Sequence, residues 1–177
     1  MNTYIALLRG INVSGQKKVS MTELRILFEK LNFKNVITYI QSGNVLFNTS
    51  KQDSSQLEGQ IKNAIMAHFG FEVSVLVITS QELNAILDNC PFSDEKTEQS
   101  YFTLLHHIPD PNLVHEVRKI DYHNEEFIIT NKCVYFYCST GYGRAKCNNN
   151  FFERKLKVTA TTRNYKTMMK LLSLCEN

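Results

Sequence analysis

Apolar and polar residues recur along this chain with two periods, one typical of strands and one typical of helices. Residues 4–11 form a short apolar run that ends among glycines, which predicts a buried strand. An apolar stripe at helical spacing then runs from Met21 to Leu31. It follows Ser20 and contains Glu23, and a serine with a glutamate three residues later is a capping box. A helix is therefore expected directly after Ser20.

The next stretch predicts a hairpin, a second helix and another strand. Residues 36–50 hold two β-rich runs on either side of Ser-Gly-Asn at 42–44, which is a hairpin signal. A second capping box at residues 55–58 predicts a helix, and residues 73–79 predict the fourth strand. The order β-α-β-β-α-β is that of a ferredoxin-like domain. A third capping box, at residues 79–82, predicts a short connecting helix.

The pattern then begins again. A polar stretch at residues 89–100 is the best candidate for a linker. Beyond it, YFTLLHHI at 101–108 echoes YIALLRGI at 4–11, and helix, hairpin, helix and strand signals follow in the same order. The sequence thus predicts an α+β protein with two tandem ferredoxin-like (split βαβ) subdomains and antiparallel sheets. We expect residues 1–92 to form the first subdomain with its connecting helix, and residues 93–177 the second with a C-terminal helix.

Bulk properties narrow the class of protein. The chain has 177 residues with 43% hydrophobic and 21% charged, and its net charge of +3 is too small to argue for nucleic acid by itself. No apolar run approaches the roughly 20 residues of a membrane span, and no signal-peptide pattern opens the chain. We expect a cytoplasmic protein without a membrane partner. Five irregularly spaced cysteines predict free thiols, no metal site and no cofactor.

The glycines after the first predicted strand resemble a phosphate-binding loop only in part. A Walker loop reads G-x-x-x-x-G-K-[ST]. Gly10 and Gly15 have the right separation, but Gln16 stands at the lysine position and Lys17 at the hydroxyl position. The helix is also expected to start only after Ser20, so the loop amides would not continue into its N-terminus. A Walker loop is excluded.

A different anion site remains, because the end of the first strand and the hairpin tip meet at one edge of a split βαβ sheet. This edge gathers hydrogen-bond donors without a nearby carboxylate: Arg9, Asn12, Lys17, Lys18, Gln41, Ser42 and Asn44. An arginine can hold a phosphate or carboxylate with two hydrogen bonds, and loop amides add further donors. The alternative is structural: Asn12, Ser42 and Asn44 satisfy backbone groups in turns, and Arg9 packs against the other subdomain.

Three motifs carry a resemblance to a known family. LRGINVSG with the helix after it, TYIQSGNVLF, and ATTRNYKTMMKL near the end resemble the bacterial domain-of-unknown-function 1697 family, over Tyr4 to about Leu172. The resemblance implies two ferredoxin-like subdomains and no established activity. Its signature positions here are Arg9, Gly10, Asn12, Gly15, Gln41, Ser42, Gly43, Asn44, Arg163, Asn164 and Thr167.

Arg163 and Asn164 open the last predicted helix, where free amides and the helix dipole favour an anion. The alternative is that Asn164 caps the helix and Arg163 forms an ion pair. The leading hypothesis is a protein that binds an anionic ligand, a nucleotide or nucleic-acid phosphate, through Arg9, Asn12, Lys17, Gln41, Ser42, Asn44, Arg163 and Asn164. A small enzyme that uses this site for oxyanion stabilisation and a protein-interaction scaffold remain as alternatives. The sequence leaves catalysis and the oligomeric state open.

Overall fold

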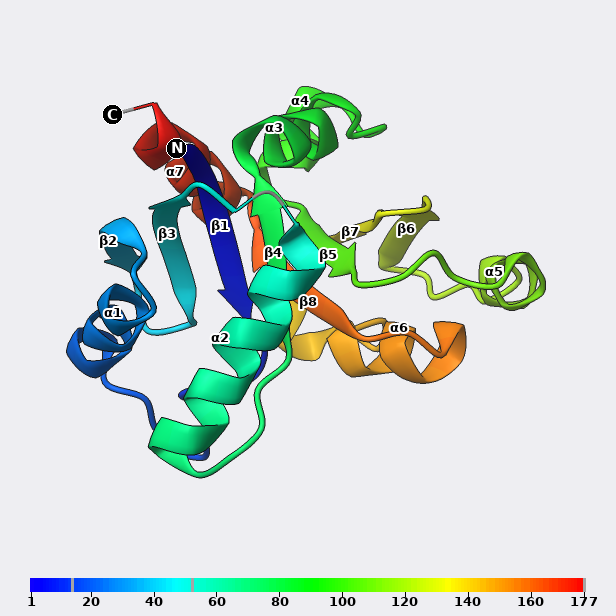
Figure 1. Cartoon of the computed structure of the whole chain (residues 1–177). Coiled ribbons are helices and arrows are strands. Elements are labelled where there is room, and N and C mark those ends of the chain that lie inside the picture. The colour runs from blue at the N-terminus through cyan, green and yellow to red at the C-terminus, as the bar shows by residue number, and fades with distance from the viewer. Residues whose placement is uncertain (14, 52, 177) are drawn as a thin grey trace. The chain divides into compact units, whose positions relative to one another are not determined.

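In the described part of the chain, eight strands form two four-stranded antiparallel sheets (Figure 1). The computed structural model describes residues 1–13, 15–51 and 53–176. The chain divides into unit 1, Met1–Asn84 with Lys170–Asn177, and unit 2, Ala85–Met169. Each unit contains one of the two sheets.

Unit 1 has the topology that the hydrophobic pattern predicts. Its elements are β1 (Asn2–Leu8), α1 (Met21–Lys30), β2 (Lys34–Tyr39), β3 (Asn44–Thr49), α2 (Ser54–Phe69) and β4 (Val75–Thr79), followed by the start of α3 (Ser80–Asp88). The strand order β2-β3-β1-β4 with antiparallel pairing is the ferredoxin-like arrangement. The predicted fold class is confirmed for this unit.

Strand alternation places the core of unit 1 on one face of its sheet. Tyr4, Ala6 and Leu8 of β1 point to the side where α1 and α2 pack, and they are buried with Phe28 of α1 and Leu57 of α2. The residues between them on β1 point to the opposite face, because neighbouring side chains on a strand alternate. This second face carries a cavity.

Unit 2 repeats the same topology. Its elements are α4 (Asp94–Glu98), β5 (Tyr101–Leu105), α5 (Pro111–Arg118), β6 (Glu125–Ile129), β7 (Cys133–Cys138), the 3₁₀ turn η1 (Tyr142–Arg144), α6 (Asn149–Leu156), β8 (Ala160–Asn164) and the first part of α7 (Tyr165–Cys175). The sheet order β6-β7-β5-β8 matches that of unit 1 strand for strand. The echo between residues 4–11 and 101–108 therefore marks the corresponding first strands, β1 and β5.

Three local predictions were wrong. The strand predicted over residues 4–11 ends at Leu8, because Gly10 adopts a left-handed conformation that no strand continues. The predicted capping box at 55–58 is not the cap of α2. Asp53 caps this helix by accepting hydrogen bonds from the amides of Ser55 and Gln56, whereas Glu58 accepts from the Val77 amide of β4.

The polar stretch at 89–100 is also more ordered than a linker. It contains α4, whose first turn carries Asp94 and Glu95, where acidic side chains favour a helix start. Ser100 directly after it is buried and its hydroxyl donates to the Lys96 carbonyl. Polarity alone did not distinguish a short surface helix from a linker.

A substitution at Gly43 tests how closely the hairpin packs against the end of β1 in unit 1. Its φ is +78°, and a Cβ there would lie 2.7 Å from Leu8 Cβ and 2.8 Å from Ile11 Cδ1. We expect Gly43→Ala to lower the free energy of unfolding by about 3 kcal/mol or more, since both backbone strain and a core clash arise. Gly10→Ala is the control: its φ is +70° but a Cβ there meets nothing within 4 Å, so only the strain of about 1–2 kcal/mol is expected. Urea unfolding measures both, and equal losses would contradict the close packing.

Candidate functional site

The two loops predicted to form the site in unit 1 are held against each other. The Leu8 amide at the end of β1 donates to the Gly43 carbonyl in the hairpin, at 2.8 Å. Asn12 adds a second connection, because its Nδ2 donates to the Gln41 carbonyl at 2.9 Å. The described residues of the first loop, 9–13 and 15–18, and the hairpin turn of residues 40–43, called here the loop pair, therefore form one surface of unit 1.

The side chain of Asn12 makes three hydrogen bonds that hold this surface together. Besides its bond to Gln41, its Nδ2 donates to the Val19 carbonyl at 3.0 Å, and its Oδ1 accepts from the Val19 amide at 2.9 Å. The Asn12 amide itself donates to the Lys17 carbonyl, and the Gln16 amide donates to the Val13 carbonyl. Asn12 is thus a structural element of the loop pair, as the alternative interpretation of the sequence expects.

Left-handed backbone conformations concentrate in the loop pair. Positive φ angles occur at Gly10, Asn12, Gly15, Lys17, Ile40 and Gly43. Glycine and asparagine adopt this region readily, but a β-branched residue there is a genuine outlier. Ile40 has a φ of 49° and is 48% exposed, so burial does not explain it. Residues with backbone strain of about 1–3 kcal/mol occur most often at functional sites. The conformation of Ile40 therefore motivates a functional hypothesis for the loop pair.

Among the described residues of the loop pair, the exposed side chains are those of Val13, Gln16, Lys17, Lys18, Ile40 and Gln41, while Arg9 and Ser42 are half-buried. Lys17 Nζ donates to the Glu72 carbonyl at 2.7 Å, which draws it toward the segment before β4. The carboxylate of Glu72 lies 3.9 Å from Lys62 Nζ and is mostly exposed. A carboxylate-bearing residue therefore does neighbour the lysines, which the sequence did not predict.

Asn44 has an internal role. It is completely buried at the start of β3, and its Nδ2 donates to the Tyr39 carbonyl at 3.0 Å and to Ser42 Oγ at 3.0 Å. These bonds close the turn between β2 and β3 across the hairpin. Asn44 therefore shapes the turn that presents Gln41 and Ser42.

Arg163 and Asn164 belong to unit 2. Asn164 Oδ1 accepts from the Thr167 amide at 2.9 Å, so this residue caps α7 as one alternative proposed. Arg163 is 8% exposed and donates to the Thr162 carbonyl at 2.9 Å. Burial lowers the pKa of its guanidinium to about 10, which shows how strongly this charge is removed from water.

Other titratable groups give no support for catalysis at the loop pair. Burial raises the pKa of the Cys147 thiol to about 12 and also raises that of the Cys133 thiol, and both thiols lie in unit 2. All five cysteines are free, and no group of His, Cys, Asp and Glu among the described residues has the arrangement of a metal site. In the described part of the chain, no helix combines the length and apolar character needed to cross a membrane.

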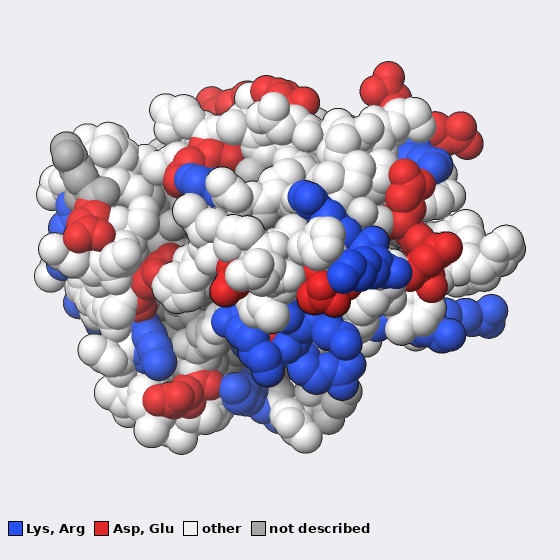
Figure 2. All heavy atoms as spheres, turned by 90° about the vertical axis from the view of Figure 1, so that its right-hand side faces the viewer, with Lys and Arg blue, Asp and Glu red and all other residues white. Residues whose placement is uncertain are grey.

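Unit 2 carries a basic surface that was not predicted from the sequence. Figure 2 shows Lys and Arg side chains gathered over α5 and α6. The exposed cations of the segment around α6, called here the α6 surface, are Arg144, Lys146, Arg154, Lys155 and Lys157. The only acidic residue between them is Glu153, whose carboxylate accepts from the Ala160 amide. The signal was available in the sequence as an uneven distribution of charge, which the small net charge of the whole chain conceals.

Comparison with known proteins agrees with the architecture. The family model "Protein of unknown function (DUF1697)" matches residues 1–135. One solved structure, that of a conserved bacterial protein, SP0830, from Streptococcus pneumoniae, is similar over 98% of each chain, with a TM-score of 0.77 and 23% sequence identity. A search of curated proteins found no match. The resemblance is confirmed over residues 1–135, which hold the first two of the three motifs, and the chain belongs to the DUF1697 family.

Proposed function

We propose that unit 1 binds a phosphate-bearing anion, such as a nucleotide, at the loop pair. The observation that supports this most is the Asn12 carboxamide, which joins the loop of residues 9–18 to the Gln41 carbonyl. Lys17 and Lys18 follow Asn12 in the same loop and are exposed, as is Gln41 in the hairpin, and Lys17 Nζ also donates to the Glu72 carbonyl. Cationic donors on a surface with fixed backbone geometry suit a compact anion.

The proposed roles differ between residues. Lys17 and Lys18 supply charge, Gln41 and Ser42 supply neutral donors, and the half-buried Arg9 adds a further positive charge. Asn12 and Asn44 position these groups rather than bind the anion, because their own hydrogen bonds are internal. The proposal rests on unit 1 alone, so Arg163 and Asn164 have no part in it.

Pyrophosphate is a suitable probe, because it is compact, highly charged and lacks a base. We expect it to raise the melting temperature of the wild-type protein, and the double variant Lys17→Ala/Lys18→Ala to weaken its binding about tenfold or more by loss of charge-assisted contacts. Lys30→Ala/Lys34→Ala removes the same charge from exposed positions elsewhere in unit 1 and should retain binding. Equal losses in the two double variants, or no wild-type response, would refute the proposal.

Asn12 allows a separate test of the support beneath the site. Asn12→Gly keeps the left-handed backbone accessible but removes three hydrogen bonds, so we expect a loss of about 2–4 kcal/mol in the free energy of unfolding. Asn32→Gly is the matched control, since Asn32 is exposed and has a φ of 65°. Urea unfolding at one pH compares the two. A loss as small as in Asn32→Gly would mean that Asn12 does not hold the loops together.

A second candidate function is binding of a polyanion on the α6 surface of unit 2. The gathering of exposed cations in Figure 2 favours it. A helix C-terminus also attracts cations through its dipole, which explains part of the pattern at Arg154 and Lys155. It does not explain Lys146, which lies before the helix with Nζ 4.8 Å from the Tyr122 ring centroid.

The salt dependence of binding tests whether the α6 surface is the place where a polyanion binds. Binding of a single-stranded oligonucleotide should weaken linearly in log K against log salt concentration, with about 0.7 in slope for each neutralised phosphate. Arg154→Ala/Lys155→Ala should therefore reduce the slope by about 1.4. Lys30→Ala/Lys34→Ala in unit 1 should leave it unchanged. A slope that changes equally in both double variants would exclude the α6 surface as the binding site.

A further inference from the structure

A cavity of about 520 Å³ lies in unit 1, apart from the loop pair. Its lining comes from β1, β2, β3 and the end of α7: Thr3, Asn35, Val36, Ile37, Leu46, Asn48, Leu174 and Cys175. The volume falls within the roughly 300–1,000 Å³ of small-molecule sites. All eight lining residues are uncharged at neutral pH, which separates this cavity chemically from the loop pair.

Strand register explains where the cavity lies. Thr3 pairs with Asn48, and Leu46 pairs with Ile37, so these side chains meet across adjacent strands. They alternate with the core residues of β1 and β3, which places them on the face of the sheet opposite α1 and α2. On this face Leu174, near the C-terminal end of α7, completes the wall.

An irregularity in β2 opens this part of the sheet. Between the pairs Lys34–Asn48 and Ile37–Leu46, β2 advances three residues while β3 advances two, which is a β-bulge. Asn35 lies inside the bulge with a φ of 49°. Bulges occur often beside binding sites because they redirect a side chain. Here the redirected residue carries a carboxamide and lines the cavity.

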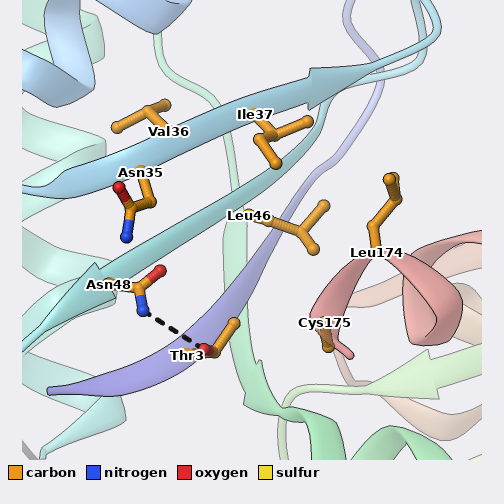
Figure 3. Close-up of a pocket in the computed structure, with 8 residues that line it drawn as sticks. All are labelled: Thr3, Asn35, Val36, Ile37, Leu46, Asn48, Leu174 and Cys175. Carbon is orange, nitrogen blue, oxygen red and sulfur yellow. Dashed lines mark hydrogen bonds between the residues drawn. The ribbon is translucent and has the colours of Figure 1, made fainter. Parts of the chain in front are cut away.

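The cavity has a polar end and an apolar end. In Figure 3 the side chains of Asn35, Asn48 and Thr3 lie toward one end, and those of Ile37, Leu46 and Leu174 toward the other. Asn48 Nδ2 donates to Thr3 Oγ1 at 3.3 Å, which fixes the amide plane of Asn48 and directs its carbonyl oxygen away from Thr3. Two carboxamides beside an apolar wall match a flat molecule with an amide-like edge.

We propose that this cavity binds a neutral, planar small molecule that carries an amide or a similar donor–acceptor edge. Asn35 and Asn48 pair with that edge, and Ile37, Leu46 and Leu174 cover its apolar body. A charged ligand would lose its hydration without meeting an opposite charge, so the site selects against ions. The site is independent of the anion proposed for the loop pair.

Nicotinamide and nicotinate form a matched pair of probes, since they share one ring and differ in a neutral amide against a carboxylate. Titration is followed by backbone and side-chain amide signals in two-dimensional NMR of the full chain. Nicotinamide should shift signals of residues 3, 35–37, 46–48 and 174–175 with a Kd on the order of 1–10 mM, as expected for so small a ligand. Nicotinate should bind at least about tenfold more weakly.

Two variants test the location. Ile37→Trp fills the cavity from a position that is 42% exposed, and it should abolish the nicotinamide shifts. Ile128→Trp is the matched control, because Ile128 is 38% exposed on β6, the strand of unit 2 that corresponds to β2. It should bind nicotinamide like the wild type. Should Ile37→Trp fail to fold, Asn35→Gly relieves the left-handed residue, removes its carboxamide and should weaken binding at least threefold.

Alkylation provides a second readout with an internal control. Cys175 and Cys90 are both half-buried, and only Cys175 lines the cavity. Bound nicotinamide should slow the reaction of iodoacetamide with Cys175 and leave that of Cys90 unchanged, as measured by peptide mass spectrometry. The proposal is overturned if nicotinamide shifts no cavity signals up to its solubility limit, if nicotinate shifts them equally well, or if Ile37→Trp binds like the wild type.

Discussion

The close approach of Gly43 to the end of β1 is the constraint on which unit 1 depends. Its carbonyl accepts from the Leu8 amide, and its α-carbon lies where a side chain would strike Leu8 and Ile11. Asn44 follows directly and pairs with Leu7 in the sheet. A displacement of the hairpin at Gly43 would therefore disturb both the register of β3 on β1 and the loop that Asn12 attaches to Gln41.

This constraint separates the family motifs into two kinds of residue. Gly43, Asn44 and Asn12 are required by the fold, since each makes contacts that close a turn or join two segments. The side chains of Lys17 and Gln41 differ in being exposed, and that of Lys17 also donates to the Glu72 carbonyl. Asn12 uses only the backbone carbonyl of Gln41, and the exposed Gln41 side chain is not needed for that contact. Ligand chemistry in the motifs is therefore to be sought in the second group.

The sequence predicted the order of elements because periodicity reports which face of each element is buried. It predicted Ser20 before α1 from the local capping pattern. It failed where the partner of a residue is distant. Glu58 fits a capping pattern but bonds to β4, and only the folded sheet reveals this. The cavity was equally hidden, because its wall includes Leu174, far along the chain from Leu46.

The two units share one topology but differ at a pair of corresponding strands, β2 and β6. In unit 2, β6 pairs with β7 without interruption from Glu125–Cys138 to Ile129–Val134. In unit 1, the corresponding β2 contains one extra residue opposite β3, and residues 35–37 of this bulged region line the cavity. A single inserted residue changes side-chain direction locally without altering strand order, so one of two units with the same topology can carry a bulge while keeping its core. The difference between the two units thus requires a change in register, not in architecture.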